Sequence, residues 1–160
     1  MVIVSDTTSL IVLEKLDSLD LLCRLFDRVL IPTVVLEEMV IGSNTIQSTF
    51  QGMSCIEIVD VPQTSRLNSL LKVLDAGEAN AIELAMTQQL PLIIDERKGR
   101  KVAQQLGVKI TGFAGLLIQA TRNQLLGSEA AVALLDKAIV NGLRLSDSLQ
   151  SQVRAQLKML

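Results

Sequence analysis

The chain has 160 residues, of which 49% are hydrophobic, and this apolar content is enough to build the core of one domain. Its formal net charge is −2. No apolar run approaches the ~18 residues of a membrane-spanning helix, and no basic region leads into a signal-like apolar stretch, so we expect a soluble, cytoplasmic protein. The sequence contains no His, Trp or Tyr, which excludes a Ser-His-Asp triad, an imidazole-bound zinc and the aromatic platforms that stack on RNA bases, and leaves any catalysis to carboxylates.

The first half of the chain alternates short β-branched runs with longer helical patterns, which is typical of repeated βα units. The polar stretch at residues 42–52 predicts a mobile loop. Cys23 and Cys55 lie within apolar patterns and lack CxxC spacing, so we expect buried free thiols rather than a disulfide or a zinc site. Strands are predicted at residues 2–4, 29–31 and 55–61, and helices at residues 10–16, 19–26, 32–40 and 63–74.

The second half continues this alternation and then becomes helical, with a last helix whose single apolar stripe is expected to dock on the core or on a second subunit. Together the elements predict an α/β three-layer sandwich with a central parallel sheet, in a single domain of residues 1–160 with a C-terminal helical extension from about residue 128. Strands are predicted at residues 92–94 and 108–110, helices at 77–89, 96–106, 114–124 and 128–140, and the last stripe at Leu149, Val153, Leu157 and Leu160.

Two aspartates directly follow predicted strands. Asp6 comes after the first strand and Asp95 after residues 92–94, and the carboxyl ends of parallel strands are where ligands bind in open α/β sheets. Asp6 either caps the following helix or binds a metal ion, with the hydroxyl of Thr7 or Ser9 on metal-bound water or substrate phosphate. Asp95 and Glu96 either start the next helix or add a further ligand.

Two glutamates lie on the apolar faces of predicted helices. Glu38 follows Val34 by four residues and shares its stripe, whereas Glu37 turns toward solvent. A carboxylate on that stripe needs either an arginine partner or a metal ion. Glu78 shares the apolar stripe of its own helix, but it also has the spacing of a capping box with Asp75.

Positive charge is concentrated beside Asp95. Each of these side chains either lies on a solvated helix face or guides a nucleic-acid backbone. The cluster consists of Arg97, Lys98, Arg100 and Lys101.

In this order the acids resemble those of the PIN-domain family, in particular VapC-like toxin ribonucleases. The stretches that carry the resemblance are residues 4–9 (VSDTTS), 31–38 (IPTVVLEE), 75–85 (DAGEANAIELA) and 94–103 (IDERKGRKVA). The resemblance implies Mg²⁺- or Mn²⁺-dependent hydrolysis of RNA by a homodimer that an antitoxin protein neutralises.

The resemblance implies that the family's acids correspond to Asp6, Glu38, Glu78 and Asp95, with Glu96 as the alternative for the last of them. It also implies that the family's polar helper, a polar residue that assists these acids, corresponds to Ser9 or Thr7. The resemblance also leads us to expect a hydroxyl residue after Gly112, where this chain has Phe113 with Thr111 nearby.

The residue types suit this chemistry without the resemblance, because hard cations bind carboxylate oxygens and activate water for phosphodiester cleavage. Without an ion the gathered carboxylates should raise one another's pKa values. Receiver-type and haloacid-dehalogenase-type sites are disfavoured, because the first strand is followed by a single aspartate. The sequence therefore predicts a metal-dependent endoribonuclease, the toxin of a toxin–antitoxin pair; the alternative is an inactive PIN-like module that binds protein or RNA.

Overall fold

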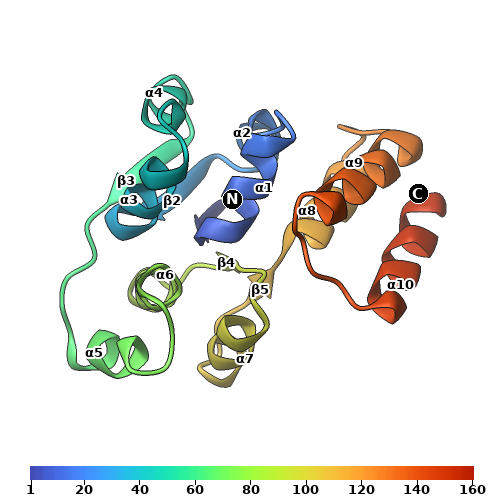
Figure 1. Ribbon diagram of the computed structural model, residues 1–160. Helices are drawn as coiled ribbons and strands as arrows, with labels where there is room; N and C mark the ends of the chain where they lie inside the picture. Colours follow the sequence, from blue (N-terminus) through green and yellow to red (C-terminus); the bar gives the residue numbers. More distant parts are fainter.

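The computed structural model describes residues 1–160 and contains one five-stranded parallel sheet with the strand order β3-β2-β1-β4-β5 (Figure 1). The strands are β1 (Val2–Ser5), β2 (Arg28–Pro32), β3 (Ile56–Val59), β4 (Leu92–Ile93) and β5 (Ile110–Thr111). The helices are α1 (Thr7–Lys15), α2 (Asp20–Leu25), α3 (Thr33–Gly42), α4 (Ile46–Gln51), α5 (Ser65–Leu71), α6 (Ala76–Gln88), α7 (Arg97–Gln105), α8 (Phe113–Arg122), α9 (Ser128–Val140) and α10 (Asp147–Lys158).

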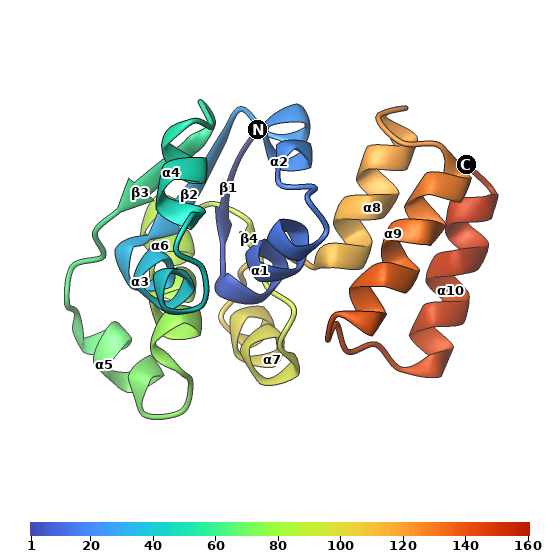
Figure 2. The ribbon, with the colours of Figure 1, turned by 45° about the horizontal axis from the view of Figure 1, so that its top comes forward.

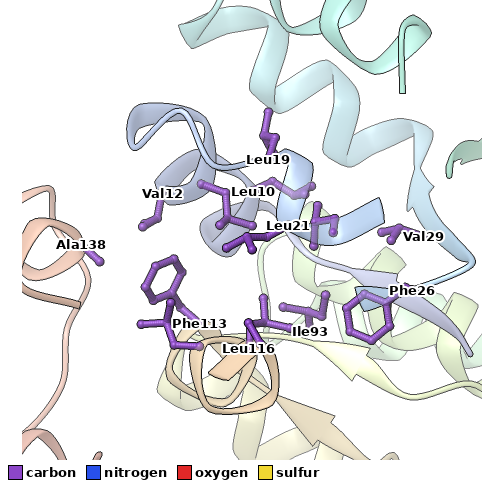
Figure 3. Packing of buried hydrophobic residues seen from close by; sticks show 14 of the residues in the cluster. Leu10, Val12, Leu19, Leu21, Phe26, Val29, Ile93, Phe113, Leu116 and Ala138 are labelled. Carbon is purple, nitrogen blue, oxygen red and sulfur yellow. The ribbon is translucent and has the colours of Figure 1, made fainter. Parts of the chain in front are cut away.

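Alternating strand residues face two separate apolar cores. On one face Ile3 and Ile93 pack with α1, α2 and α8, where the Phe113 ring lies among aliphatic side chains (Figure 3). On the other face Val4 and Leu92 pack with α5, α6 and α7. Because side chains of a strand point alternately to the two sides, helices cover both faces, and the predicted three-layer sandwich is confirmed.

The last two helices lie beyond α8, away from the sheet (Figure 2). Val153 and Leu157 of α10 are buried in the same apolar cluster as Ile3, whereas Leu149 and Leu160 remain exposed. The stripe of the last helix therefore docks on the core of its own chain. None of the helices is both long and apolar enough to cross a membrane.

The prediction of a loop at residues 42–52 is wrong, because the chain forms α4 there. Ile46 and Phe50, one helical turn apart, are both buried and anchor this short helix to the core. Two apolar residues among polar ones gave too weak a pattern to predict it.

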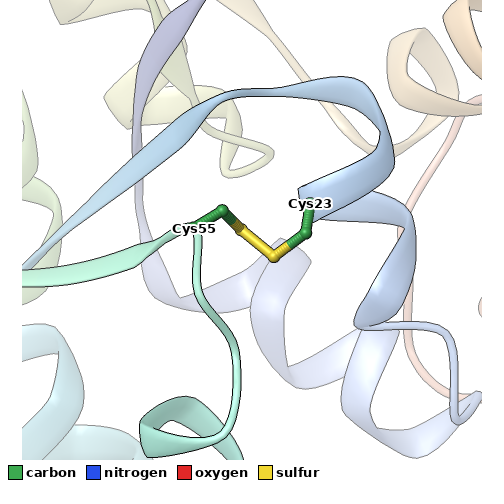
Figure 4. The surroundings of a disulfide bond; sticks show 2 residues. All are labelled: Cys23 and Cys55. Carbon is green, nitrogen blue, oxygen red and sulfur yellow. A yellow bond between two sulfur atoms is a disulfide. The ribbon is translucent and has the colours of Figure 1, made fainter.

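The prediction of free thiols is also wrong. Cys23 of α2 and Cys55, which precedes β3, form a disulfide whose Cα atoms are 5.3 Å apart (Figure 4). The pairing of β2 with β3 places Cys55 beside Val29, because the Val29 N–H donates to the Cys55 carbonyl at 2.8 Å, and α2 with Cys23 directly precedes β2. A separation of 32 residues carries no sequence signal for this pairing.

Candidate functional site

Asp6 lies at the centre of the carboxyl edge of the sheet. β1 pairs with β2 on one side and β4 on the other, and the Asp6 N–H donates to the Ile93 carbonyl at 3.0 Å. This position leaves Asp6 only 2% exposed. Asp6 precedes α1 as its N-cap residue, but its carboxylate makes no capping hydrogen bond, and Oδ1 has no partner at all.

Burial is the main reason why the pKa of the Asp6 carboxyl is raised to about 7. The negative charges of Asp75 and Glu38 raise it further, and contacts with Thr7 only partly offset the rise. A buried carboxylate oxygen without a hydrogen-bond partner is costly for the fold, which favours a role other than helix capping.

Glu38 faces the same region from α3, which begins directly after β2. Its side chain is half-buried and its Oε2 accepts a hydrogen bond from the Thr7 hydroxyl at 2.8 Å. No arginine pairs with it, whereas its neighbour Glu37 is exposed. The helix orientation inferred from Val34 thus agrees with the structure.

Glu78 approaches from α6, where only half of the predicted capping box forms. Asp75 caps the helix by accepting the Glu78 N–H at 2.8 Å, but Glu78 Oε2 is buried without a partner. Burial raises the pKa of Glu78 to about 8, helped by a hydrogen bond to Asp75 and by the charges of Asp75 and Asp6. The side chain that the capping box would hold at the surface is therefore turned inward.

Asp95 lies after β4 with its own set of partners. It accepts a hydrogen bond from the Ser9 hydroxyl, and its Oδ1 accepts one from the Phe113 N–H at 3.0 Å. Burial raises the pKa of Asp95 against the opposing influence of Ser9, Phe113 and the Arg100 guanidinium. Glu96 is exposed instead, and its Oε1 accepts a long hydrogen bond from the Thr8 hydroxyl at 3.4 Å. The structure thus turns Asp95 inward and Glu96 outward.

The residue after Gly112 contacts Asp95 without needing a hydroxyl. The Phe113 ring is fully buried in the core, and only its backbone N–H reaches the acid. Thr111 points its hydroxyl toward Gly115 instead. The hydroxyl contact to Asp95 comes from Ser9 of α1, one of the two residues expected as the polar helper, and not from the residue after Gly112.

The basic residues of α7 divide into two kinds. Arg97, Lys98 and Lys101 are exposed, whereas Arg100 is half-buried and donates from Nη1 to the Ile94 carbonyl at 2.7 Å. Arg100 therefore supports the end of β4, whereas the other three basic side chains are exposed and available to bind a ligand.

The structure brings Glu38 and Glu78 each within electrostatic reach of Asp6, with Asp95 just after the neighbouring strand β4. It also adds Asp75, which the sequence indicated only as a helix cap. No three acidic side chains converge closely enough to enclose an ion as they stand. The two unpartnered buried oxygens, on Asp6 and Glu78, nevertheless offer the oxygen donors that hard cations prefer.

Comparison with known proteins gives one family. No curated protein matches the sequence. A family model described as a PIN domain matches residues 2–159, which includes all five strands and the acids at their carboxyl edge. The parallel sandwich and its acidic edge agree with this match, and the chain belongs to the PIN-domain family.

Proposed function

We propose that this PIN domain is an endoribonuclease that depends on a divalent metal ion, Mg²⁺ or Mn²⁺. PIN domains are generally nucleases, and those nucleases typically use divalent metals. The observation that carries the proposal is the pair of buried carboxylate oxygens without partners, Asp6 Oδ1 and Glu78 Oε2. A bound cation would satisfy both oxygens and favour the ionised forms of two carboxyls whose pKa values are raised to about 7 and about 8.

The ligands in this proposal are Asp6, Glu38, Glu78 and Asp95, while Glu96 stays outside. When bound, the ion activates water and stabilises charge on the scissile phosphate. The chain's own groups orient the ligands, because the Thr7 hydroxyl holds Glu38 and the Ser9 hydroxyl holds Asp95.

RNA is the proposed substrate, and the protein would hold it through its phosphate backbone. Arg97, Lys98 and Lys101 are exposed on α7, the helix that follows Asp95, and aromatic side chains for base stacking are scarce. Thr7 and Ser9, which already donate to acids, would contact substrate only by exchanging those partners.

We extend the proposal to a toxin of a toxin–antitoxin pair that acts as a homodimer, on the resemblance to VapC-like toxins. Expression of the chain should then stop growth of a bacterial host, and co-expression of the product of an adjacent small open reading frame should restore it. Light scattering should give twice the chain mass. Growth that is unaffected by the wild-type chain would contradict the toxin role but not the nuclease activity.

The alternative is a metal-free PIN-like module that binds RNA or protein. It is favoured by one observation, namely that no three acidic side chains enclose an ion as the structure stands. Such a module has no need of the two costly unpartnered oxygens on Asp6 and Glu78, so titration with Mn²⁺ separates the two functions.

The test is cleavage of a mixed RNA pool by the purified chain with Mn²⁺, with and without excess EDTA. Cleavage should stop with EDTA and should be absent in Asp6→Asn, a variant of nearly equal shape. Circular dichroism provides the control that this variant is folded. Cleavage that persists in folded Asp6→Asn would show that a contaminating nuclease was measured.

A further inference from the structure

Three glycines lie directly against three of the acidic side chains. If a β-carbon is built on each of them, it falls 2.5–2.6 Å from a carboxylate oxygen, whereas real β-carbons essentially never approach other atoms more closely than 3.0 Å. Each carboxylate therefore occupies the space that a side chain would fill. The pairs are Gly77 with Glu38, Gly99 with Glu78, and Gly112 with Asp95.

Backbone conformation does not require glycine at these positions. The glycines with positive φ are Gly107 and Gly142, neither of which contacts an acid. Gly77 lies in the first turn of α6 and Gly99 in the first turn of α7, where alanine would favour the helix more than glycine does. The space for the carboxylates remains as the physical reason for glycine there.

We infer that Gly77, Gly99 and Gly112 are positioning residues of the acidic site. They leave the room in which the acids of neighbouring elements take their places: α6 makes room for Glu38, α7 for Glu78, and the start of α8 for Asp95. This inference rests on the proposed metal site, because it is the placement of ligands that the glycines would control.

The contact at Gly99 involves a carboxylate oxygen that nothing else holds. Glu78 Oε2 is buried and has no hydrogen-bond partner, so a methyl group on residue 99 would push it away from its place. At Gly77 the methyl group would meet both oxygens of Glu38, one of which the Thr7 hydroxyl holds at 2.8 Å. Displacing Glu38 would therefore also break a hydrogen bond that orients it.

At Gly77 the displaced atoms are only the carboxylate end of Glu38, a flexible side chain that can move without a backbone shift. Alanine there should therefore leave the fold intact and should even support α6 through its higher helix propensity. At Gly99 the methyl group would also meet Cδ1 of the buried Ile94 at 2.7 Å, so Gly77 gives the cleaner test. A loss of metal affinity without a loss of stability is the signature that separates a positioning role from ordinary packing.

The experiment is Mn²⁺ titration of the full chain by isothermal titration calorimetry, with melting temperatures in EDTA as the measure of folding. Gly77→Ala and Gly99→Ala should bind Mn²⁺ roughly 10- to 100-fold more weakly than the wild type, as changes around metal ligands typically do. The melting temperature of Gly77→Ala in EDTA should be unchanged or higher, and Gly99→Ala, whose methyl group also meets buried Ile94, should remain folded in EDTA. The matched controls are Gly42→Ala and Gly127→Ala, where a β-carbon meets nothing within 4 Å, and these should bind like the wild type.

A second substitution tests the cause directly. Glu38→Asp in the Gly77→Ala background should recover part of the lost affinity, because the aspartate is one methylene shorter and clears the added methyl group. Glu38→Asp alone should bind more weakly than the wild type, so recovery in the double variant would mark a steric conflict between these two positions.

The possible failures are distinguishable. A wild-type chain that binds no Mn²⁺ overturns the proposed function and this inference with it. A wild type that binds, with Gly77→Ala and Gly99→Ala within about twofold of it, overturns the inference alone. Variants that lose their folded state in EDTA assign these glycines to packing and also overturn it.

Discussion

Two adjacent glutamates with opposite surroundings give the sharpest test at the scale of single residues. Glu38 accepts a hydrogen bond from Thr7 and faces Asp6, whereas Glu37 is exposed. Glu38→Gln should abolish RNA cleavage and the Mn²⁺-induced rise in melting temperature. Glu37→Gln should leave both within a few-fold of the wild type, because surface substitutions are usually near neutral. Identical behaviour of the two variants in thermal scans and cleavage assays would contradict the proposed second ligand.

Asp75 combines a helix cap with a negative charge beside the site, and two substitutions separate these contributions. Asp75→Asn should keep the cap, since asparagine is an equally good N-cap residue, whereas Asp75→Ala should lower the free energy of unfolding by about 1 kcal/mol. Urea unfolding in EDTA measures both. If the two variants are equally destabilised, the bond from the Glu78 N–H does not stabilise α6.

The position of a site residue could be predicted from the sequence only where its neighbours along the chain determine it. The inward turn of Glu38 followed from helix geometry alone, and the place of Asp6 followed from the end of a strand. Asp75 joins the site only because α6 packs against β1, and the Ser9 hydroxyl meets Asp95 only because β4 lies beside β1. Contacts of this kind depend on the tertiary arrangement, which one sequence does not reveal. The roles of these residues in metal binding and catalysis stay predictions.

The Cys23–Cys55 disulfide belongs to the scale of elements, because it ties α2 to the start of β3. Reduction should lower the free energy of unfolding by about 2–4 kcal/mol, since the crosslink restricts the unfolded chain. Urea unfolding with and without dithiothreitol measures this change. The double variant Cys23→Ser, Cys55→Ser is the control, because its stability should not respond to dithiothreitol.

The exposed face of α7 gives a second prediction at this scale. Replacement of Arg97, Lys98 and Lys101 by Gln should weaken RNA binding and reduce the slope of log affinity against log salt by about 2, since each phosphate contact on a single strand releases counterions. Arg100→Gln should instead lower stability, because its guanidinium supports the Ile94 carbonyl. Filter binding of an RNA to the Asp6→Asn background at several salt concentrations measures the slope. An unchanged slope in the triple variant would assign these residues to an ordinary solvated surface.

Elements with long periodic patterns were predicted more accurately than short ones. The helix predicted at residues 128–140 is α9 with the same limits, because thirteen residues of regular pattern define it well. The strand predicted at residues 108–110 begins two residues later than expected, as Ile110–Thr111, because its pairing with β4 determines its limits. A two-residue strand has no periodicity of its own, so only its partner fixes it.

For the molecule as a whole, the raised pKa values of two carboxyls predict how stability depends on pH. Asp6 and Glu78 have folded-state pKa values of about 7 and about 8, well above their ordinary values. The folded state therefore keeps their protons longer than the unfolded state does, so their stabilising contribution is complete below about pH 4 and is lost as the pH rises through 7 and 8. In EDTA the melting temperature should be lower at pH 8.5 than at pH 5.5.

Few other groups complicate this test. The chain has no His, both cysteines are in the disulfide, and the pKa values of Asp27 and Glu83 are lowered. Asp95, whose pKa burial also raises, adds to the effect in the same direction. Asp6→Asn should flatten the dependence, and Mn²⁺ should stabilise the wild type more at pH 8.5 than at pH 5.5, because binding requires ionised ligands. A wild-type melting temperature that does not fall between pH 5.5 and pH 8.5 in EDTA would contradict the raised pKa values.

The single-domain organisation with a helical extension from about residue 128 stays a prediction. The apolar cluster that joins Ala131, Leu135 and Leu157 to Ile3 supports it. Calorimetry should therefore give one two-state unfolding transition, whereas two separated transitions would indicate that α9 and α10 unfold on their own.

The position of β1 at the centre of the sheet has a consequence for the order in which the protein matures during synthesis. Asp6 is synthesised well before Leu92–Ile93, yet its burial requires β2 on one side and β4, at Leu92–Ile93, on the other. A growing chain that has not yet exposed β4 therefore carries the acid in water, where its carboxyl is ionised and unpositioned. Nascent or prematurely terminated chains that end before β4 should consequently be inert, and any activity should appear only after Leu92–Ile93 has been made and has paired with β1.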